Sequence, residues 1–344
     1  MLAVTLVCRV GLGRGVPPME DVTPTATATS TSTSTATSTS TPTETPTDTA
    51  TDTATATDTA TATATATVNA PPPEKGPPPP PYSLPWSLRP AIMVTVVRLD
   101  AAIAFRSDGR ALGSTLTAAY KAAPNFGALM RLAFVSDSTS GQNAFGNPVF
   151  GVLYTPELTK GLRLPLFLAV SVPCGSGGAG DSKPKDAAAP AAGVYARSAM
   201  DNMLFGVNYV TVVAGVGLAY VAKGFTIQGE GALFQAVRDR GDAYESDELR
   251  TNLTTGLHVG YTPVKPLTLS AELRYQRWLS APSVVAGDPS KVDQITVGVG
   301  IRTRIEVVTD KVVLRPGVAY FNPLDDPMWN KGYHVVVVDV PVVF

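Results

Sequence analysis

The chain has 344 residues, of which 44% are apolar and 16% charged, and 27 Lys and Arg residues against 28 Asp and Glu residues give a formal net charge of -1. This balance excludes a nucleic-acid-binding protein that relies on bulk positive charge. Two cysteines exclude a disulfide scaffold, and two histidines without a cysteine cluster argue against a zinc site, so we expect no metal and no cofactor.

Residues 1–22 have some features of an export signal. Met1 to Cys8 is a short apolar run, but no basic residue precedes it and Arg9 follows it directly. A complete signal peptide has basic residues before its apolar run. We therefore interpret residues 1–22 as a truncated signal region whose true start lies upstream. The alternative, a lipid-modified Cys8, fits poorly because Thr5-Leu6-Val7 precedes that cysteine.

Residues 23–90 have the composition of a disordered linker. From Thr23 to Thr67 every odd-numbered residue is threonine, and large apolar side chains are absent from the positions between. No burial can then offset the entropy cost of ordering this stretch. The proline-rich stretch Pro71 to Pro81 should be extended and fairly stiff. The segment is interpreted as an envelope tether, a glycosylated stalk, or a low-complexity insertion with no role of its own.

From residue 91 onward, apolar residues alternate with polar or small ones, which is typical of strands with different environments on their two faces. In the stretch 249–261, for example, Leu253 and Leu257 share one parity, whereas Asn252 and His258 have the other. The pattern predicts twelve strands at 92–106, 112–122, 126–136, 147–155, 161–173, 207–221, 224–238, 248–261, 266–279, 293–306, 311–321 and 332–344. Each reaches the length of about 9 to 11 residues with which a tilted strand crosses a bilayer.

The connections between these segments differ in length according to their place in the order. Those after even-numbered segments are short, at 123–125, 156–160, 222–223, 262–265 and 307–310. Those after odd-numbered segments are mostly longer and polar, at 137–146, 174–206, 239–247, 280–292 and 322–331, and only 107–111 is brief. Tight turns on one rim and long loops on the other are typical of a transmembrane barrel, whose turns face the periplasm.

Aromatic residues with the apolar parity gather at the ends of the predicted strands. Beside the short turns these are Tyr120, Phe126, Tyr154, Tyr220, Phe225 and Tyr261, and Phe344 falls on the same face and rim. At the other rim they are Phe105, Phe134, Tyr275 and Tyr320. Two girdles of lipid-facing aromatic residues are expected where a barrel meets the two membrane interfaces.

With these features, residues 91–344 resemble a Gram-negative outer-membrane β-barrel of the porin or channel kind. The last strand is similar to the C-terminal signal read by the barrel-assembly machinery, because it ends in an aromatic residue preceded by alternating apolar ones, namely Val336, Val338, Val340, Val342 and Phe344. The resemblance implies an all-β fold, a transmembrane antiparallel up-and-down barrel of about 12 strands with a disordered N-terminal extension. It also implies the outer membrane of a Gram-negative bacterium as location, and the lipid bilayer and the assembly machinery as partners.

Two other folds compete for the same residues. By hydropathy alone, residues 204–222 would pass for a transmembrane helix. Their valines and glycines disfavour a helix, however, and large residues such as Leu218 alternate with small ones such as Gly217. In a soluble β-sandwich the apolar parity would form one shared core, which would leave the aromatic girdles without an explanation.

If the polar parity faces inward, charged side chains line the lumen. The candidate lumen-lining residues are Arg98, Asp100, Arg131, Arg163, Glu230, Arg250, His258, Glu272, Arg274, Arg302, Arg304, Arg315 and Asp339. Their arginines outnumber their carboxylates, which favours a narrow, positively biased channel for small, including anionic, solutes. The alternative is that arginine and acidic side chains pair across the lumen and plug it.

We therefore expect a channel for passive or facilitated passage of small solutes, with a non-conducting structural or adhesin-type envelope barrel as the alternative. The connection 174–206 would narrow the channel if it folds inward, and would be only a surface loop if it folds outward. An enzyme is not expected. Asp325 and Asp326 are near His334 in sequence, but His334 has the lipid-facing parity, and His258 has no serine arrangement beside it.

Overall fold

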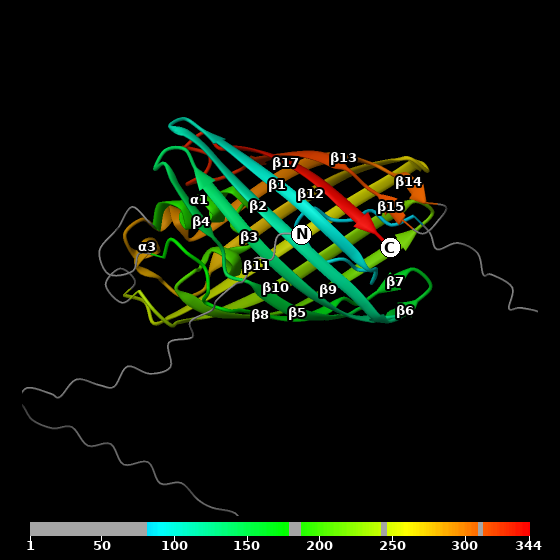
Figure 1. Ribbon diagram of the computed structural model, residues 1–344, viewed down its shortest axis with the longest axis horizontal. Helices are drawn as coiled ribbons and strands as arrows, with labels where there is room; N and C mark the ends of the chain where they lie inside the picture. Colours follow the sequence, from blue (N-terminus) through cyan, green and yellow to red (C-terminus); the bar gives the residue numbers. More distant parts are fainter. Residues whose placement is uncertain (1–80, 179–186, 242–245, 309–311) are drawn as a thin grey trace, which may run out of the picture. The chain divides into compact units, whose positions relative to one another are not determined.

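The computed structural model describes residues 81–178, 187–241, 246–308 and 312–344 of the chain (Figure 1). The predictions for the signal region and for most of the linker, residues 1–80, lie outside the described residues.

Twelve antiparallel strands form a closed barrel, as the alternation in the sequence predicts. They are β1 (Val96–Arg106), β2 (Gly109–Ala123), β3 (Phe126–Asp137), β5 (Val149–Tyr154), β8 (Leu166–Ser171), β9 (Tyr209–Ala222), β10 (Phe225–Arg238), β11 (Leu249–Val264), β12 (Leu267–Trp278), β13 (Asp293–Thr303), β16 (Gly317–Pro323) and β17 (His334–Val343). Each pairs with the next, and β17 closes the ring on β1 in a register that runs from Val96 opposite Val343 to Phe105 opposite His334.

Five shorter strands extend the wall at its ends. They are β4 (Gln142–Phe145), β6 (Glu157–Thr159), β7 (Leu162–Arg163), β14 (Ile305–Val308) and β15 (Val312–Leu314). Figure 1 shows β6, β7, β14 and β15 at one end of the barrel and β4 at the opposite end. We call the first end the short-turn rim, because it also holds the tight turn Lys223-Gly224, and the second end the long-loop rim. Lys223 (φ 49°) and Gly224 (φ 83°) both have the positive φ that such a two-residue hairpin turn requires.

The outer surface of the barrel carries the apolar parity. Leu257 and Val299 are 44% and 61% exposed, although both are large hydrophobic residues at the middle of their strands. The predicted girdle residues are also exposed, except Phe134 and Tyr275, which are partly exposed, and Phe225 stacks on Tyr261 with ring centroids 4.3 Å apart. A soluble sandwich would bury this surface. A closed barrel with an even number of strands and an apolar exterior is instead a transmembrane barrel of the Gram-negative outer membrane.

The transmembrane helix that hydropathy alone would allow at 204–222 does not form, and β9 occupies most of this stretch, as the alternation of large and small residues predicts. Among the described residues, none of the helices has both the length and the apolar character to cross a membrane.

The first predicted strand begins later than expected, at Val96 rather than at residue 92. The linker expected over residues 23–90 ends earlier in the structure, because residues 81–90 belong to the barrel unit and Trp86 is only 1% exposed. No periodicity in the sequence marks this stretch, because its burial comes from the surrounding barrel wall rather than from a regular element of its own.

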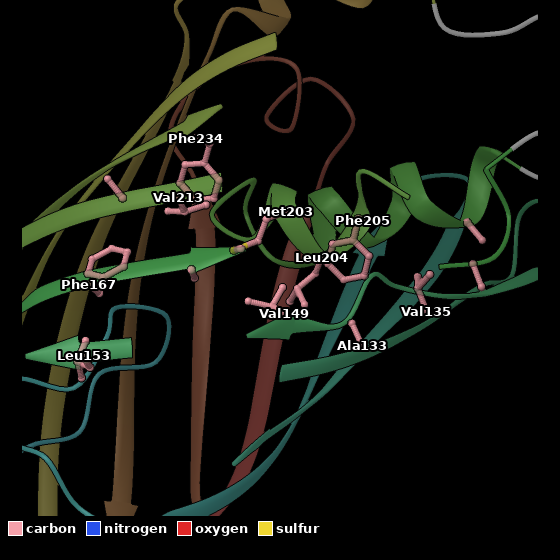
Figure 2. Close-up of a cluster of buried hydrophobic side chains, with 14 of the residues drawn as sticks. Ala133, Val135, Val149, Leu153, Phe167, Met203, Leu204, Phe205, Val213 and Phe234 are labelled. Carbon is pink, nitrogen blue, oxygen red and sulfur yellow. The ribbon is translucent and has the colours of Figure 1, made fainter. Parts of the chain in front are cut away.

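The connection between β8 and β9 folds inward at the long-loop rim. It contains α1 (Ala188–Ala196) and α2 (Asn202–Phe205), and the connection between β12 and β13 contains α3 (Ser283–Ala286) and the 3-10 turn η2 (Pro289–Lys291). Met203, Leu204 and Phe205 pack in a buried cluster with wall residues such as Val149 and Phe234 (Figure 2). The main apolar core among the described residues thus lies inside the barrel, around an inserted loop.

Candidate functional site in the lumen

A segment of the chain before β1 lies inside the barrel, and we call residues 82–93 the strap. The Tyr82 hydroxyl donates to Gln228 Oε1 (3.1 Å) and accepts from the backbone N–H of Ala91 (2.8 Å), so it joins the two ends of the strap. The Ser83 N–H donates to Thr226 Oγ1 at 3.0 Å, close to the short-turn rim, where β10 begins. The strap is therefore a loop that enters the lumen from that rim and returns to it.

Two wall carboxylates hold the backbone of the strap. Glu272 accepts hydrogen bonds from the N–H groups of Trp86 (2.8 Å) and Ser87 (3.1 Å). Glu230 accepts from the N–H of Arg89 at 2.8 Å and from its guanidinium at 3.0 Å. Buried backbone donors need such partners, and bonds to charged acceptors are the stronger kind.

Wall arginines hold the carbonyl groups of the same segment. Arg98 donates to the carbonyls of Pro85 (3.0 Å) and Trp86 (2.7 Å), and Arg315 donates to that of Tyr82 (3.0 Å). Arg302 donates to the carbonyl of Leu84, and its guanidinium lies 3.5 Å from the centroid of the Trp86 ring. The charged lumen face is thus used to bind a peptide segment.

Glycines on the inner face of the wall make room for the strap. A Cβ at Gly256 would lie 2.3 Å from the Leu88 side chain, and a Cβ at Gly300 would lie 2.5 Å from the Trp86 ring. A Cβ at Gly260 would lie 2.1 Å from Ser83. Glycine inside a strand marks close approach of another segment, and these inward-facing glycines are the sequence signal that could have revealed the strap.

The second inserted segment comes from the connection 174–206, which therefore folds inward rather than outward. We call its residues 188–205 the loop insert. Arg197 donates to Asp100 on the wall and, at 3.0 Å, to Asp201 within the loop insert. Arg131 on β3 donates both terminal nitrogens to the two Asp201 oxygens, at 2.6 and 2.9 Å.

Ion pairs connect the loop insert with the strap. From Arg197 the chain of contacts runs through Asp100 to Arg98 (3.7 Å), then to Asp339 (3.0 Å) and Arg302 (2.5 Å). Among the described residues, seven arginines in this interior contact five carboxylates or the strap, which leaves an excess of two positive charges. The arginines are Arg89, Arg98, Arg131, Arg197, Arg274, Arg302 and Arg315, and the carboxylates are Asp100, Asp201, Glu230, Glu272 and Asp339. Paired charges of this kind match the plugged alternative that the sequence left open.

Most of the candidate lumen-lining residues lie inside the barrel, and three lie at its ends. Arg163 pairs with Glu157 (2.5 Å) at the short-turn rim, where Arg304 also pairs with Glu306 (3.2 Å). Arg250 pairs with Asp247 (2.8 Å) near the long-loop rim. The other ten are buried or nearly so within the lumen, namely Arg98, Asp100, Arg131, Glu230, His258, Glu272, Arg274, Arg302, Arg315 and Asp339. Sequence reasoning missed Arg89, Arg197 and Asp201, which come from the strap and the loop insert.

His258 is fully buried between the strap and the wall. Its Nε2 lies 3.0 Å from the Ser83 hydroxyl, and its Nδ1 lies 3.5 Å from Glu272. The sequence pattern predicts no serine beside His258, and the structure shows that Ser83 lies there. The Ser83 hydroxyl is enclosed, however, and only 1% of the residue is exposed. The pair therefore fastens the strap.

The other residues considered for chemistry do not come together. His334 lies on the outside, with its Nδ1 2.6 Å from the Tyr320 hydroxyl, whereas Asp325 accepts from the N–H of Ile295 at 2.7 Å. Within the described part of the chain, no group of three or more His, Cys, Asp or Glu side chains is arranged to hold a metal ion.

The residues of the predicted assembly signal lie on the outer face of β17. Val338, Val340 and Phe344 are exposed, and Val336 and Val342 are partly exposed. Because β17 pairs with β1, these residues flank the seam at which the barrel closes. Their recognition by the assembly machinery stays a prediction.

A cavity of about 80 Å³ remains between the two inserted segments and the wall. It is lined by Arg98, Arg131 and Arg197 and by apolar side chains such as Leu153 and Phe167. A larger recess of about 530 Å³ lies at the long-loop rim, between the loop insert and residues such as Trp278.

No protein-family model matches the chain, and no curated protein matches its sequence. Solved structures resemble it in fold. A KdgM porin in complex with oligogalacturonate is 13% identical over 72% of this chain and 99% of its own, with a TM-score of 0.42. A NanC porin is 12% identical over 72% and 98%, with a TM-score of 0.43. The COG4313 outer membrane channel from Pseudomonas putida F1 is 11% identical over 75% and 98%, with a TM-score of 0.46.

Proposed function

We propose that this outer-membrane barrel is a channel for small solutes that its own strap and loop insert hold closed. The observation that carries the proposal is the nature of the obstruction. Two chain segments bound through hydrogen bonds and ion pairs fill the lumen, and the wall provides glycines and charged groups to receive them. A barrel built only for support could fill its interior with larger wall side chains instead.

The strap can leave the lumen without threading through it. Its start contacts Thr226 and its end runs into Thr95, whose carbonyl accepts from the N–H of Phe344 (3.0 Å) beside β17. Both ends therefore lie at the short-turn rim, and withdrawal is a local movement of a tethered segment. Most of the groups that hold the strap are polar, so hydrogen bonds with water can replace their bonds to the strap when the strap leaves.

With the strap and the loop insert displaced, the inner face of the barrel wall would favour anionic solutes modestly. Five wall arginines face four wall carboxylates once both inserted segments are displaced; they are Arg98, Arg131, Arg274, Arg302 and Arg315, with Asp100, Glu230, Glu272 and Asp339. A surplus of arginine in a narrow, water-filled lumen attracts anionic solutes.

A second candidate is a non-conducting envelope barrel. The paired charges in the interior favour it, because a permanently satisfied network rigidifies a barrel without any need for opening. The two candidates differ in what happens when the strap is weakened.

Conductance in planar bilayers tests the proposal. We expect the full chain to be mostly silent, and a variant without residues 82–93 to give steady ion steps with a preference for anions. Trp86→Ala is the second variant in case the deletion does not fold, and Trp329→Ala, a change at a tryptophan that is 58% exposed, is its matched control. Gel mobility before and after boiling verifies that each barrel is folded. Strap variants that are folded but stay silent, also when Asp201→Ala loosens the loop insert from Arg131, would refute the channel and support the envelope role.

A further inference from the structure

Arg131 on the barrel wall binds a carboxylate in the geometry that proteins use for carboxylate ligands. Both of its terminal nitrogens donate to Asp201, and this two-pronged arrangement matches the planes of the two groups. The Asp201 side chain is 1% exposed. Asp201 belongs to the loop insert and not to the wall, so the carboxylate leaves Arg131 whenever the loop insert moves.

An apolar side chain follows this carboxylate two residues along the chain. Met203 is 1% exposed and belongs to the same buried cluster as Val149, Leu153 and Phe167 (Figure 2). The stretch from Asp201 to Met203 therefore presents a carboxylate to an arginine and an unbranched apolar chain to a hydrophobic part of the wall. This combination has the chemistry of a small carboxylic acid with an apolar tail.

The cavity beside this stretch is lined by both kinds of side chain. Arg98, Arg131 and Arg197 line it together with Leu153, Phe167 and Met203. The Nε of Arg98 is buried and makes no hydrogen bond, and it lies 3.7 Å from an oxygen of Asp100. The volume of about 80 Å³ is roughly half that of a cavity of about 150 Å³ that holds benzene. A molecule of a few heavy atoms, such as propionate, would fill it.

We propose that Arg131, with Arg98 at the same cavity, is the solute-binding site of the lumen, and that Asp201 and Met203 occupy it as a tethered substitute for the solute. The solutes it selects are small monocarboxylates with a short apolar tail. This inference rests on the proposed channel function. The carboxylate of a solute competes with Asp201 for Arg131. The solute that is to pass therefore favours release of the loop insert.

Binding of propionate to the purified full chain tests the site. Asp201→Ala leaves Arg131 without its carboxylate, and propionate at about ten times its Kd should raise the Tm of this variant by about 3 to 6 °C. Propionamide at equal concentration and chloride at equal ionic strength should not. The double variant Asp201→Ala with Arg131→Gln should lose the response. Asp201→Asn, which keeps the shape of the side chain, replaces Asp201→Ala should that variant fail to fold.

Asp247→Ala is the matched control, because it removes the carboxylate of another arginine pair, at Arg250, outside the cavity. An equal response to propionate in this variant would overturn the assignment. So would an equal response of Asp201→Ala to propionamide.

Conductance separates this inference from the channel function. In a background without residues 82–93, so that the strap is absent, the permeability of propionate relative to chloride in Asp201→Ala should exceed that in Asp201→Ala with Arg131→Gln by about tenfold, the ratio that 1.4 kcal/mol gives. Conduction with no difference between the two variants would overturn the carboxylate site and leave the channel intact. Propionate binding in a barrel that stays silent without the strap would support the site and refute the channel.

Discussion

Replacing Trp86 with alanine should release the strap while the barrel stays folded. The indole is 1% exposed, donates to Ser270 Oγ at 3.0 Å, and lies under the Arg302 guanidinium. Truncation of a buried aromatic side chain costs about 3 to 5 kcal/mol. The strap outside the lumen has no such contacts, so nearly all of this loss falls on the inserted state. A loss of about 4 kcal/mol shifts the equilibrium toward the released strap by about a thousandfold.

Chemical labelling measures this shift. In a background with Cys8→Ser and Cys174→Ser, a cysteine introduced by Ser83→Cys is enclosed in the inserted strap, because Ser83 is 1% exposed. When opening is fast relative to labelling, the rate follows the population of the open state. We expect a maleimide to label this site about a thousandfold faster after Trp86→Ala. Trp329→Ala should leave the rate unchanged.

Two results would refute the reasoning. An unchanged labelling rate would mean that Trp86 does not hold the strap in the lumen. Loss of heat-modifiable gel mobility together with faster labelling would mean that strap and barrel unfold as one unit, and that the strap is not a separable plug.

Three further predictions address the mouth, the outer face and the inner face of the barrel. Burial acts to raise the pKa of Asp247, but hydrogen bonds from Ser283 and the ion pair with Arg250 outweigh burial and leave this pKa below its ordinary value. The attachment of α3 to Asp247 should therefore be stable above about pH 4 and be lost as the pH falls through the lowered pKa. Hydrogen exchange of the Ser283 N–H would report this loss. Leu257→Arg should destabilise the barrel in lipid by about 2 to 4 kcal/mol in denaturant titrations, and a stabilising or neutral effect would contradict a lipid-facing position. Gly300→Val should expel the strap and raise conductance, whereas Gly229→Ala, which has room for its Cβ, should do neither.

The strands and the lipid-facing surface could be predicted from the sequence because a single repeating constraint controls them. Every second residue of a strand such as β11 must suit the membrane, so Leu253 and Leu257 carry the pattern independently of any partner. The aromatic residues at strand ends obey a similarly local rule, since each responds to its own depth in the bilayer.

The contents of the lumen could not be predicted in the same way. The strap has neither a helical nor a strand period, and its burial depends on Glu272, Glu230 and Arg302, which lie far from it in sequence. Likewise, nothing local marks Asp201 as the partner of Arg131, because their contact exists only once the loop insert is folded into the barrel. Inward-facing glycines are a local signal that something approaches the wall, but they do not identify the segment.

A reversible crosslink between strap and wall tests the central claim most directly. Leu88 Cγ lies 3.3 Å from the position of a Cβ at Gly256, which suits a disulfide between Leu88→Cys and Gly256→Cys. In the Trp86→Ala background without native cysteines, we predict ion conduction under reducing conditions, silence after oxidation, and recovery after the disulfide is reduced again. Conduction that persists after complete crosslinking would contradict a channel closed by its own strap.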